Sequence, residues 1–502
     1  MNIEYMYGRY NEFINPGYPV QKAQTLFRIM QEGISSPKAI EDKIIEYEIK
    51  NTLENLMSRQ ALVEDSNFLQ PKSIFWRMQY LNLILTSLPD VFFKRFKITA
   101  KKIENITMAI TMYYFGLQTY KFGGKPISST QMKNLIGRED FYLGIDEIKI
   151  VCWEIEESDF TAYINMFAKE VSQIEPDDKV RLYLYNNECF ILCIEDFVEY
   201  IQYRVEDIFK ENSTEQEISE YTRKKGFGFE EIVFRVLYLC LPDIYHTLHY
   251  YPNDRQKIEV DIVARQNEKL LVTECKSGTL DLQNVDKDEA VKLLINNKMQ
   301  KAHKSLRNVA NYISTASGYS FSCEEKKIEG RCEKLFLLNV PMYSADFISS
   351  NIHTLFPKYT EGCDVPILTI SLEHLFALVI DNLKKMTDLL DYLDKRIAYI
   401  KEYPGVQFEN NELDLYYELV NENKGTMLSE LKKLGMLDNM NPNGRIVGTY
   451  HDELGNETRP ALILLRQLDQ YLLLGIFDAG KKWFGINKRY LRNLEDFLRI
   501  DL

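Results

Sequence analysis

Two short apolar segments separated by four polar residues constrain the fold of this chain more than any other feature. The first segment reads KIEVDIVA (257–264) and the second reads KLLVTECK (269–276). The residues between them, Arg265 to Glu268, suit a tight connection of the kind that joins the strands of a β-hairpin. We therefore predict that the two segments are strands that pair with each other.

Charged side chains on these two strands are expected to meet in one place. Successive side chains of a strand point to opposite faces, so Glu274 and Lys276 point the same way and Cys275 lies behind them. On the earlier strand, Asp261 and Val263 alternate with an apolar face formed by Ile258, Val260 and Ile262. Pairing can then place Asp261 beside Glu274, with Lys276 next to both.

Two neighbouring carboxylates need a compensating positive charge, because ionised and unpaired they would be strongly unfavourable in a buried position. A divalent cation resolves this conflict, and the hard oxygen ligands of Asp261 and Glu274 favour Mg²⁺ or Mn²⁺. A lysine such as Lys276 beside the cation can orient or deprotonate an attacking water molecule, whose pKa the metal lowers. These groups together suit hydrolysis of a phosphodiester.

A helix before the hairpin offers a further carboxylate. The segment GFGFEEIVFRVLYLCLP (226–242) predicts a helix that begins near Glu230. Phe234 follows at i+4, which puts Glu230 on the inward face, whereas Glu231 has Arg235 at i+4 and suits an exposed ion pair. In the alternative interpretation, both acids lie on the surface.

The order of these motifs resembles the PD-(D/E)XK nuclease superfamily, which includes the restriction-endonuclease-like enzymes. GFGFEE is similar to the family's first-helix motif, EVDIV to its strand aspartate and ECK to its Glu-x-Lys. The family's usual proline before the aspartate is missing, because Val260 occupies that position. The resemblance covers roughly residues 215–380 and implies a restriction-endonuclease-like α/β core with a mixed sheet in αβββαβ order.

The resemblance also implies roles for individual residues. The catalytic set would be Glu230, Asp261, Glu274 and Lys276. Mg²⁺ (or Mn²⁺) would lie between Asp261 and Glu274 with the backbone carbonyl of Cys275 as a further ligand, and Glu230 would hold a second metal or a water molecule. Lys276 would position the attacking water and stabilise charge on the phosphate. The expected reaction is cleavage of DNA that leaves a 5′-phosphate.

A helix expected from about residue 289 to 311 follows the Glu-x-Lys strand. Its basic residues are spaced by three and form one stripe, made of Lys298, Lys301, Lys304 and Arg307. Such a stripe neutralises several phosphates in nucleic-acid complexes. The alternative is a solvated helix face without a ligand.

The length of 502 residues indicates several domains. The apolar patterning predicts a helical N-terminal domain (1–145), a small α/β lobe (146–212), the nuclease-like domain (213–380) and a helical, then mixed α/β, C-terminal region (381–502). In the small lobe, IKIVCWEI (148–155) alternates like a strand, and RLYLYNNECFILCI (181–194) reads as two strands with a turn at Asn186 and Asn187. Strands at 334–340 and 365–370 complete the nuclease-like core.

Composition limits the expected location and partners. The net charge of −13 argues against a protein coated in nucleic acid, although a local basic surface would suffice for DNA binding. No apolar run reaches membrane-spanning length and no signal pattern begins the chain, so we expect a cytoplasmic protein without membrane contact. The eight cysteines form no CxxC pair, which argues against a zinc site.

Other functions remain open. The chain could be a non-cleaving nucleic-acid-binding module, or a subunit that docks a partner protein, because the flanking regions exceed what the chemistry needs. Nucleases of this fold often act as dimers, so a homodimer is one expected assembly. No Walker A pattern is present, so an energy-coupled activity would require a separate ATPase subunit. A role in bacterial antiviral defence or restriction follows by analogy alone.

Overall fold

The computed structural model describes residues 73–122 and 142–458, apart from shorter stretches of which 279–298 is the longest. Contacts divide the chain into two compact units. The first consists of Met1–Asn67 and Phe93–Ile201, and the second of Phe68–Phe92 and Gln202–Leu502. The four regions expected from the sequence are a finer division, and their boundaries stay predictions.

The first unit combines helices with a small sheet. It contains α6 (Ala100–Phe122), α8 (Ile145–Val151), α9 (Glu157–Phe167), β1 (Ala168–Glu170), the 3₁₀ helix η2 (Val171–Gln173), β2 (Leu182–Tyr185) and β3 (Glu188–Phe190). Strand β1 pairs in parallel with β2, and β2 pairs antiparallel with β3. The latter pairing confirms the two strands predicted within residues 181–194. Helices α5 (Asp90–Phe96) and α10 (Ile194–Glu211) each contribute residues to both units.

The strand predicted for residues 148–155 is wrong, because Ile148 to Val151 belong to helix α8. The Glu147 carboxylate accepts a hydrogen bond of 2.8 Å from the backbone N–H of Gly144, so the first turn of the helix is capped. The backbone N–H of Cys152 donates to the carbonyl oxygen of Ile148 at the other end. Local capping therefore overrides the strand preference of the β-branched residues in this segment.

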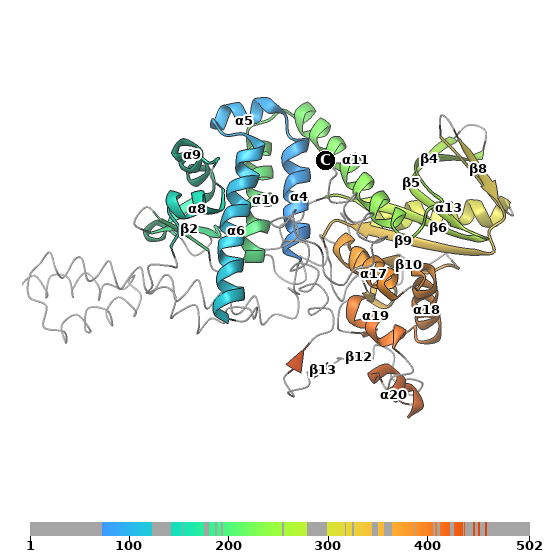
Figure 1. The fold of residues 1–502 in the computed structure, drawn as a ribbon. Coiled ribbons are helices and arrows are strands. Elements are labelled where there is room, and N and C mark those ends of the chain that lie inside the picture. Colours follow the sequence, from blue (N-terminus) through green and yellow to red (C-terminus); the bar gives the residue numbers. More distant parts are fainter. Residues whose placement is uncertain are drawn as a thin grey trace, which may run out of the picture. The chain divides into compact units, whose positions relative to one another are not determined.

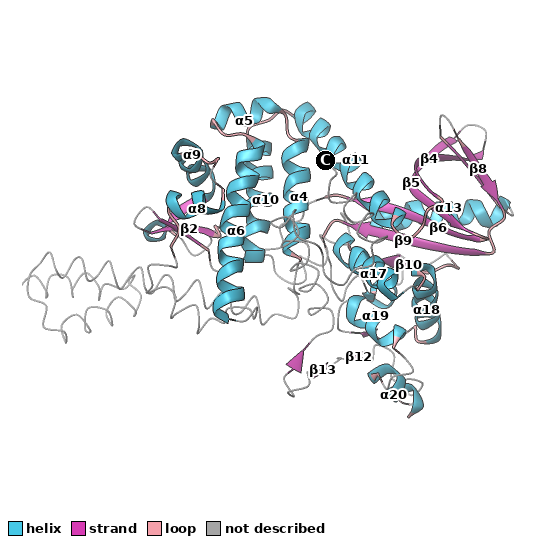
Figure 2. Cartoon of the chain, viewed as in Figure 1, coloured by secondary structure: helices cyan, strands magenta, loops and turns pink. Residues whose placement is uncertain are grey.

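A mixed sheet of seven strands forms the centre of the second unit (Figures 1 and 2). Its strand order is β10-β9-β6-β5-β4-β7-β8. The strands are β4 (Ile244–Asn253), β5 (Gln256–Gln266), β6 (Lys269–Lys276), β7 (Tyr319–Ser322), β8 (Lys327–Gly330), β9 (Lys334–Pro341) and β10 (Ile367–Thr369). Strands β6, β9 and β10 run parallel, and the other neighbours are antiparallel. The predicted α/β class with a mixed sheet is thus confirmed.

The hairpin predicted from residues 257–276 is formed by β5 and β6. Its connection is shorter than expected, since Gln266 already pairs with Lys269 and Arg265 pairs with Leu270. Asn267 adopts a left-handed backbone conformation with φ of 55°, which asparagine tolerates better than most residues. This tight turn fixes the register of the two strands and hence the position of the charged residues on them.

Helix α11 (Glu215–Tyr238) begins well before Glu230, where the sequence had suggested its start. Thr214 caps the helix: its hydroxyl accepts from the backbone N–H of Glu217, and the Glu217 carboxylate accepts from the backbone N–H of Thr214. The helix continues through Gly226 and Gly228, although each glycine costs about 1 kcal/mol relative to alanine. The helix contacts β4, β6 and helices α4 (Ile74–Ser87) and α17 (Leu372–Lys385).

Helix α13 (Gln300–Ala316) covers the strands that carry the predicted site and extends beyond residue 311, the expected end. Its apolar residues join side chains of the sheet in one hydrophobic cluster, which includes Leu306, Val309, Val263, Val272 and Leu337. The predicted strands at 334–340 and 365–370 are confirmed as β9 and β10. The β7–β8 hairpin was not predicted, and it extends the sheet beyond β4.

The remaining described elements are a short helix between β9 and β10 and the helices and short strands of the region that follows α17. They are α15 (Ile352–Leu355), α18 (Leu389–Glu402), α19 (Glu412–Val420), α20 (Met427–Lys433), β11 (Gln407–Phe408), β12 (Arg445–Ile446), β13 (Tyr450–His451) and β14 (Glu457–Thr458). Within this region the buried guanidinium of Arg396 pairs with Glu412 at 3.1 Å. Of the helices that the structure describes, none has the length and apolarity needed to cross a bilayer.

Candidate active site

Asp261, in the middle of β5, and Glu274, near the end of β6, lie opposite each other where the pairing of the two strands ends. The ladder between β5 and β6 ends with the pair Ile262 and Thr273, and the next step along both strands brings Asp261 opposite Glu274. At this point a side-chain hydrogen bond replaces the backbone ladder: the Oδ2 of Asp261 accepts a hydrogen bond of 2.7 Å from the backbone N–H of Cys275. The structure therefore brings these two predicted site residues together.

Glu274 is held from two sides. The ammonium of Lys276 donates to Glu274 Oε2 at 3.0 Å, which confirms that both side chains point the same way. The hydroxyl of Ser305 on α13 donates to Glu274 Oε1 at 2.6 Å. Glu274 is only 5% exposed, so the two donors fix the orientation of an almost buried carboxylate.

The ammonium of Lys276 contacts the backbone as well as the Glu274 carboxylate. It donates to the carbonyl oxygen of Cys275 at 3.0 Å. Burial opposes its positive charge, but the carboxylates of Glu274 and Asp261 outweigh burial and raise the pKa of Lys276 above its ordinary value. The ammonium is therefore fully charged at neutral pH.

Glu230 approaches the same group of charges from helix α11. Burial, followed by the negative charges of Asp261 and Glu259, raises the pKa of Glu230 to about 8. Burial and the charge of Glu274 likewise raise the pKa of Asp261 to about 7. These carboxylates oppose one another's ionisation, which a nearby cation would relieve. The neighbouring Glu231 instead pairs with Arg235 at 2.5 Å, as predicted.

A row of buried polar side chains continues from Glu274 across the parallel strands. Glu274 pairs in register with Asn339 of β9, and Asn339 pairs in register with Thr369 of β10. The Asn339 amide lies 3.4 Å from the Thr369 hydroxyl, and that hydroxyl lies 3.2 Å from the buried imidazole of His303 on α13. Helix α13 thus contacts both ends of the row through Ser305 and His303.

The backbone beside Asp261 departs from regular strand geometry. Thr247 lies between His246 and Leu248, which pair with Ile262 and Val260, so Thr247 lies across from Asp261. Its φ of 54° is an outlier for a β-branched residue and indicates local strain. On β5, Val260 and Val263 both belong to the hydrophobic cluster that includes Leu306 and Val309.

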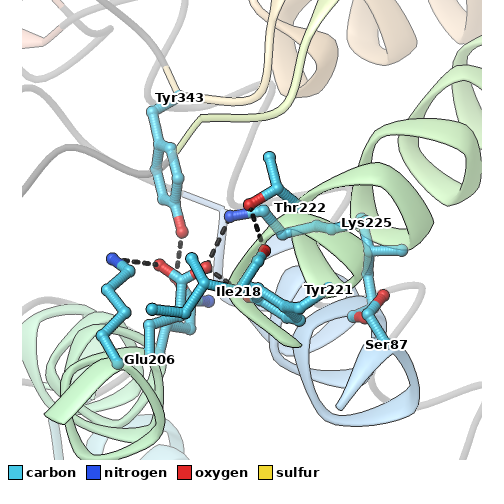
Figure 3. Close-up of polar contacts among 10 residues, drawn as sticks. Ser87, Glu206, Ile218, Tyr221, Thr222, Lys225 and Tyr343 are labelled. Atoms are coloured by element: carbon cyan, nitrogen blue, oxygen red, sulfur yellow. Dashed lines mark hydrogen bonds and ion pairs between the residues drawn. The ribbon is translucent and has the colours of Figure 1, made fainter. Parts of the chain in front are cut away.

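A buried ion pair fixes the helix that carries Glu230 (Figure 3). The Lys225 ammonium lies 2.5 Å from Oε1 of Glu206 on α10, and the Tyr221 hydroxyl donates to the same oxygen. Burial lowers the pKa of Lys225, while the Glu206 carboxylate acts in the opposite direction. Because Lys225 and Tyr221 precede Glu230 on the same helix, this cluster sets the rotation of α11 about its axis.

The basic stripe predicted on α13 is placed only in part. Lys301 and Lys304 are exposed and Arg307 is half-buried, whereas Lys298 lies outside the described residues. The apolar side of the helix faces the sheet through Leu306 and Val309. The exposed lysines are therefore available to solvent, and their contact with nucleic acid stays a prediction.

The donor set fits a hard divalent cation. Within the described parts of the chain, no three His, Cys, Asp or Glu side chains form a ready metal-binding group. Mg²⁺ is commonly held by one or two carboxylates together with water and substrate phosphates, so Asp261 and Glu274 meet that requirement. The buried thiol of Cys275 has a pKa well above its ordinary value, which leaves its backbone carbonyl as the available ligand.

Ser305 is a site residue that the sequence analysis missed. It follows Ala302 by three positions and precedes Val309 by four, so it lies on the apolar side of α13. A polar residue within an apolar helix face was the available signal. Its partner Glu274 could not be identified from the sequence, because the pairing depends on how α13 packs on the sheet.

Comparisons with known proteins add no assignment: no family model, no curated protein and no solved structure matches this chain. The functional assignment consequently rests on the site itself.

Proposed function

We propose that this chain is a metal-dependent nuclease of the PD-(D/E)XK type, with a restriction-endonuclease-like core around β4, β5, β6 and β9. The observation that carries the proposal is the meeting of Asp261, Glu274 and Lys276 at the end of the β5–β6 hairpin. An almost buried carboxylate that shares its surroundings with a second carboxylate is costly, which supports a functional reason for the arrangement.

The residues present suggest a division of roles. Asp261, Glu274 and the Cys275 carbonyl would hold Mg²⁺ or Mn²⁺, which supplies Lewis-acid stabilisation of the phosphate oxygens. Lys276 would donate hydrogen bonds to the phosphate and stabilise its developing negative charge. Ser305 keeps the Glu274 carboxylate oriented. Glu230 would hold a second metal or a water molecule from the side of α11.

The proposed reaction consumes one water molecule for each bond cut. The water oxygen forms a bond to phosphorus, the bond between phosphorus and the 3′ oxygen breaks, and the leaving oxygen takes up a proton. The products are a 5′-phosphate and a 3′-hydroxyl. DNA is the proposed substrate, as the resemblance in sequence implies.

The direct test is incubation of the full chain with plasmid, linear duplex, single-stranded DNA and RNA, in Mg²⁺, Mn²⁺ or EDTA. We expect cleavage that requires the metal and is lost in Asp261→Ala and Lys276→Ala. Lys269→Ala is the matched control, because Lys269 lies on the same strand and pairs with Asp391 at the opposite end of β6. This control should cut like the wild type.

The outcomes separate the competing functions. Equal cleavage by the wild type and both site variants would assign the activity to another group or to a contaminant. Binding of nucleic acid in Mg²⁺ without any product would favour the non-cleaving module.

A further inference from the structure

The face of α11 that carries Glu230 also carries Arg223 and Phe227, two residues to which the proposed chemistry gives no role. Arg223, Phe227 and Glu230 follow one another at i, i+4 and i+7, so they lie along one face of the helix. Figure 3 shows that Lys225 and Tyr221 instead point toward Glu206, on the buried face. The first three residues therefore lie on the side away from the buried ion pair.

Phe227 is 47% exposed, and the guanidinium of Arg223 lies over its ring at 5.6 Å from the centroid. A single exposed apolar side chain is common and carries little information. This ring, however, lies one helical turn before Glu230 and has a cation beside it. An aromatic face next to a positive charge is suited to a nucleobase and its phosphate.

Gly226 provides an independent observation. Among the described residues, a methyl group added to Gly226 would meet just the Ser277 hydroxyl, at an ordinary contact distance of 3.9 Å. The nearby Gly228 differs, because a methyl group there would lie 2.5 Å from the buried Leu83 side chain. Within the described parts of the chain, packing therefore explains Gly228 but gives no reason for the helix-weakening glycine at 226.

The position of Gly226 suggests that reason. It precedes Glu230 by four residues and lies beside Ser277, the residue that follows Lys276. The backbone of Gly226, which carries no side chain, thus borders the proposed site next to Phe227. Glycine is the usual residue where a ligand must approach the backbone closely.

We propose that the nucleic-acid strand enters the site unpaired, passes over Gly226 and stacks a base on Phe227, while Arg223 contacts a phosphate. This inference rests on the proposed function and narrows its substrate to single strands or to duplex ends and junctions with unpaired nucleotides. The shared chemistry is an unpaired base on a phosphodiester backbone, which both DNA and RNA offer.

The test measures binding separately from cleavage. Fluorescently labelled oligothymidylate, oligouridylate and a blunt hairpin duplex, each of about twelve nucleotides or base pairs, are titrated with the full chain in EDTA. We expect the single strands to bind more tightly than the duplex. Phe227→Ala should weaken single-strand binding about tenfold or more, and Phe227→Trp should retain it. Tyr417→Ala removes another exposed aromatic, 42% exposed on α19, and should leave binding unchanged.

Gly226→Ala gives a readout that a purely structural role would not produce. Alanine should raise the melting temperature, since it favours the helix and has room, yet it should weaken single-strand binding. Unchanged binding by Gly226→Ala or Phe227→Ala, or preference for the duplex, would overturn the inference. If these variants bind like the wild type but the wild type still cleaves, the nuclease assignment stands and the single-strand inference fails. If binding depends on Phe227 but no cleavage occurs, the single-strand inference stands and the nuclease assignment fails.

Discussion

The Ser305 hydroxyl donates a 2.6 Å hydrogen bond to Glu274 Oε1, and it thereby couples helix α13 to the proposed metal-binding carboxylate. Removing the hydroxyl in Ser305→Ala should let the carboxylate rotate. Loss of such a supporting contact typically costs tenfold to hundredfold in metal affinity or activity, so we expect an effect of about that size. Titration of cleavage with Mn²⁺ would measure it.

The control for Ser305 is Thr315→Ala on the same helix. The Thr315 hydroxyl is exposed and donates to the carbonyl oxygen of Asn311, four residues earlier. Its removal should change neither the Mn²⁺ dependence nor the rate. A Ser305→Ala variant with the wild-type Mn²⁺ dependence would show that the contact does not position Glu274.

Asp261→Asn should stabilise the metal-free protein while abolishing cleavage. Burial and the charge of Glu274 disfavour ionised Asp261, so a neutral amide relieves repulsion. In EDTA at about pH 8 we expect the free energy of unfolding in urea to rise by roughly 1–3 kcal/mol. Added Mg²⁺ should raise the melting temperature of the wild type alone.

Asp243→Asn provides the opposite case for comparison. Asp243 is paired with Arg265 at 2.6 Å, so neutralising it removes a favourable contact instead of a repulsion. This variant should be no more stable than the wild type. If the Asp261→Asn protein is less stable in EDTA than the wild type, the ionised Asp261 carboxylate does not destabilise the metal-free protein, and this interpretation is refuted.

Removing one partner of the buried Lys225–Glu206 pair should be strongly destabilising. Lys225→Met leaves the Glu206 carboxylate buried without its ammonium partner, a change that typically costs about 3–5 kcal/mol. Lys224→Met breaks a solvent-exposed pair with Glu220 and should cost less than about 1 kcal/mol. Urea unfolding of both variants measures the difference, and equal losses would contradict the buried role of Lys225.

The His353 imidazole should make the folded protein less stable as the pH falls. Burial, and then the charge of Arg396, lowers its pKa in the folded protein to about 3, from an ordinary value of 6.5. The unfolded chain therefore binds the proton first, so the stabilising contribution is complete above pH 6.5 and is lost as the pH falls toward 3. At about pH 5 the loss amounts to roughly 2 kcal/mol.

His353→Leu should lack this component. We expect its unfolding free energy to fall less between about pH 7 and pH 5 than that of the wild type. Urea titrations at both values would measure the slopes. Parallel slopes for the two proteins would mean that His353 does not titrate in this manner.

The sequence carried enough information for the centre of the site, because a two-residue periodicity and a short connection constrain a hairpin strongly. Asp261, Glu274 and Lys276 could therefore be placed together without tertiary knowledge. Ser305 and Asn339 could not, since their positions next to Glu274 depend on the packing of α13 and on the register of a distant strand. The strain at Thr247 also has no signature in the residues themselves.

The errors in secondary structure have local physical causes. The start of α11 was placed too late because the apolar periodicity becomes clear only near Glu230, whereas the Thr214 cap begins the helix earlier. Residues of α8 were assigned to a strand because apolar and polar residues alternate there, whereas the structure forms a helix capped by Gly144 and Glu147. In both cases the hydrogen bonds of the helix start decided the structure.

The buried polar row has a consequence for how the sheet assembles. Strand β9 is apolar on both faces, so hydrophobicity alone would let it slide past β6 by one or two residues. Only the observed alignment brings Asn339 beside Glu274 and Thr369, and a slip of β9 by one residue would place the Glu274 carboxylate beside Leu338 or Val340. The Glu274 carboxylate, proposed for metal binding, thus also favours the observed register between β6 and β9. Correct pairing of the parallel strands therefore depends on a residue of the proposed reaction centre.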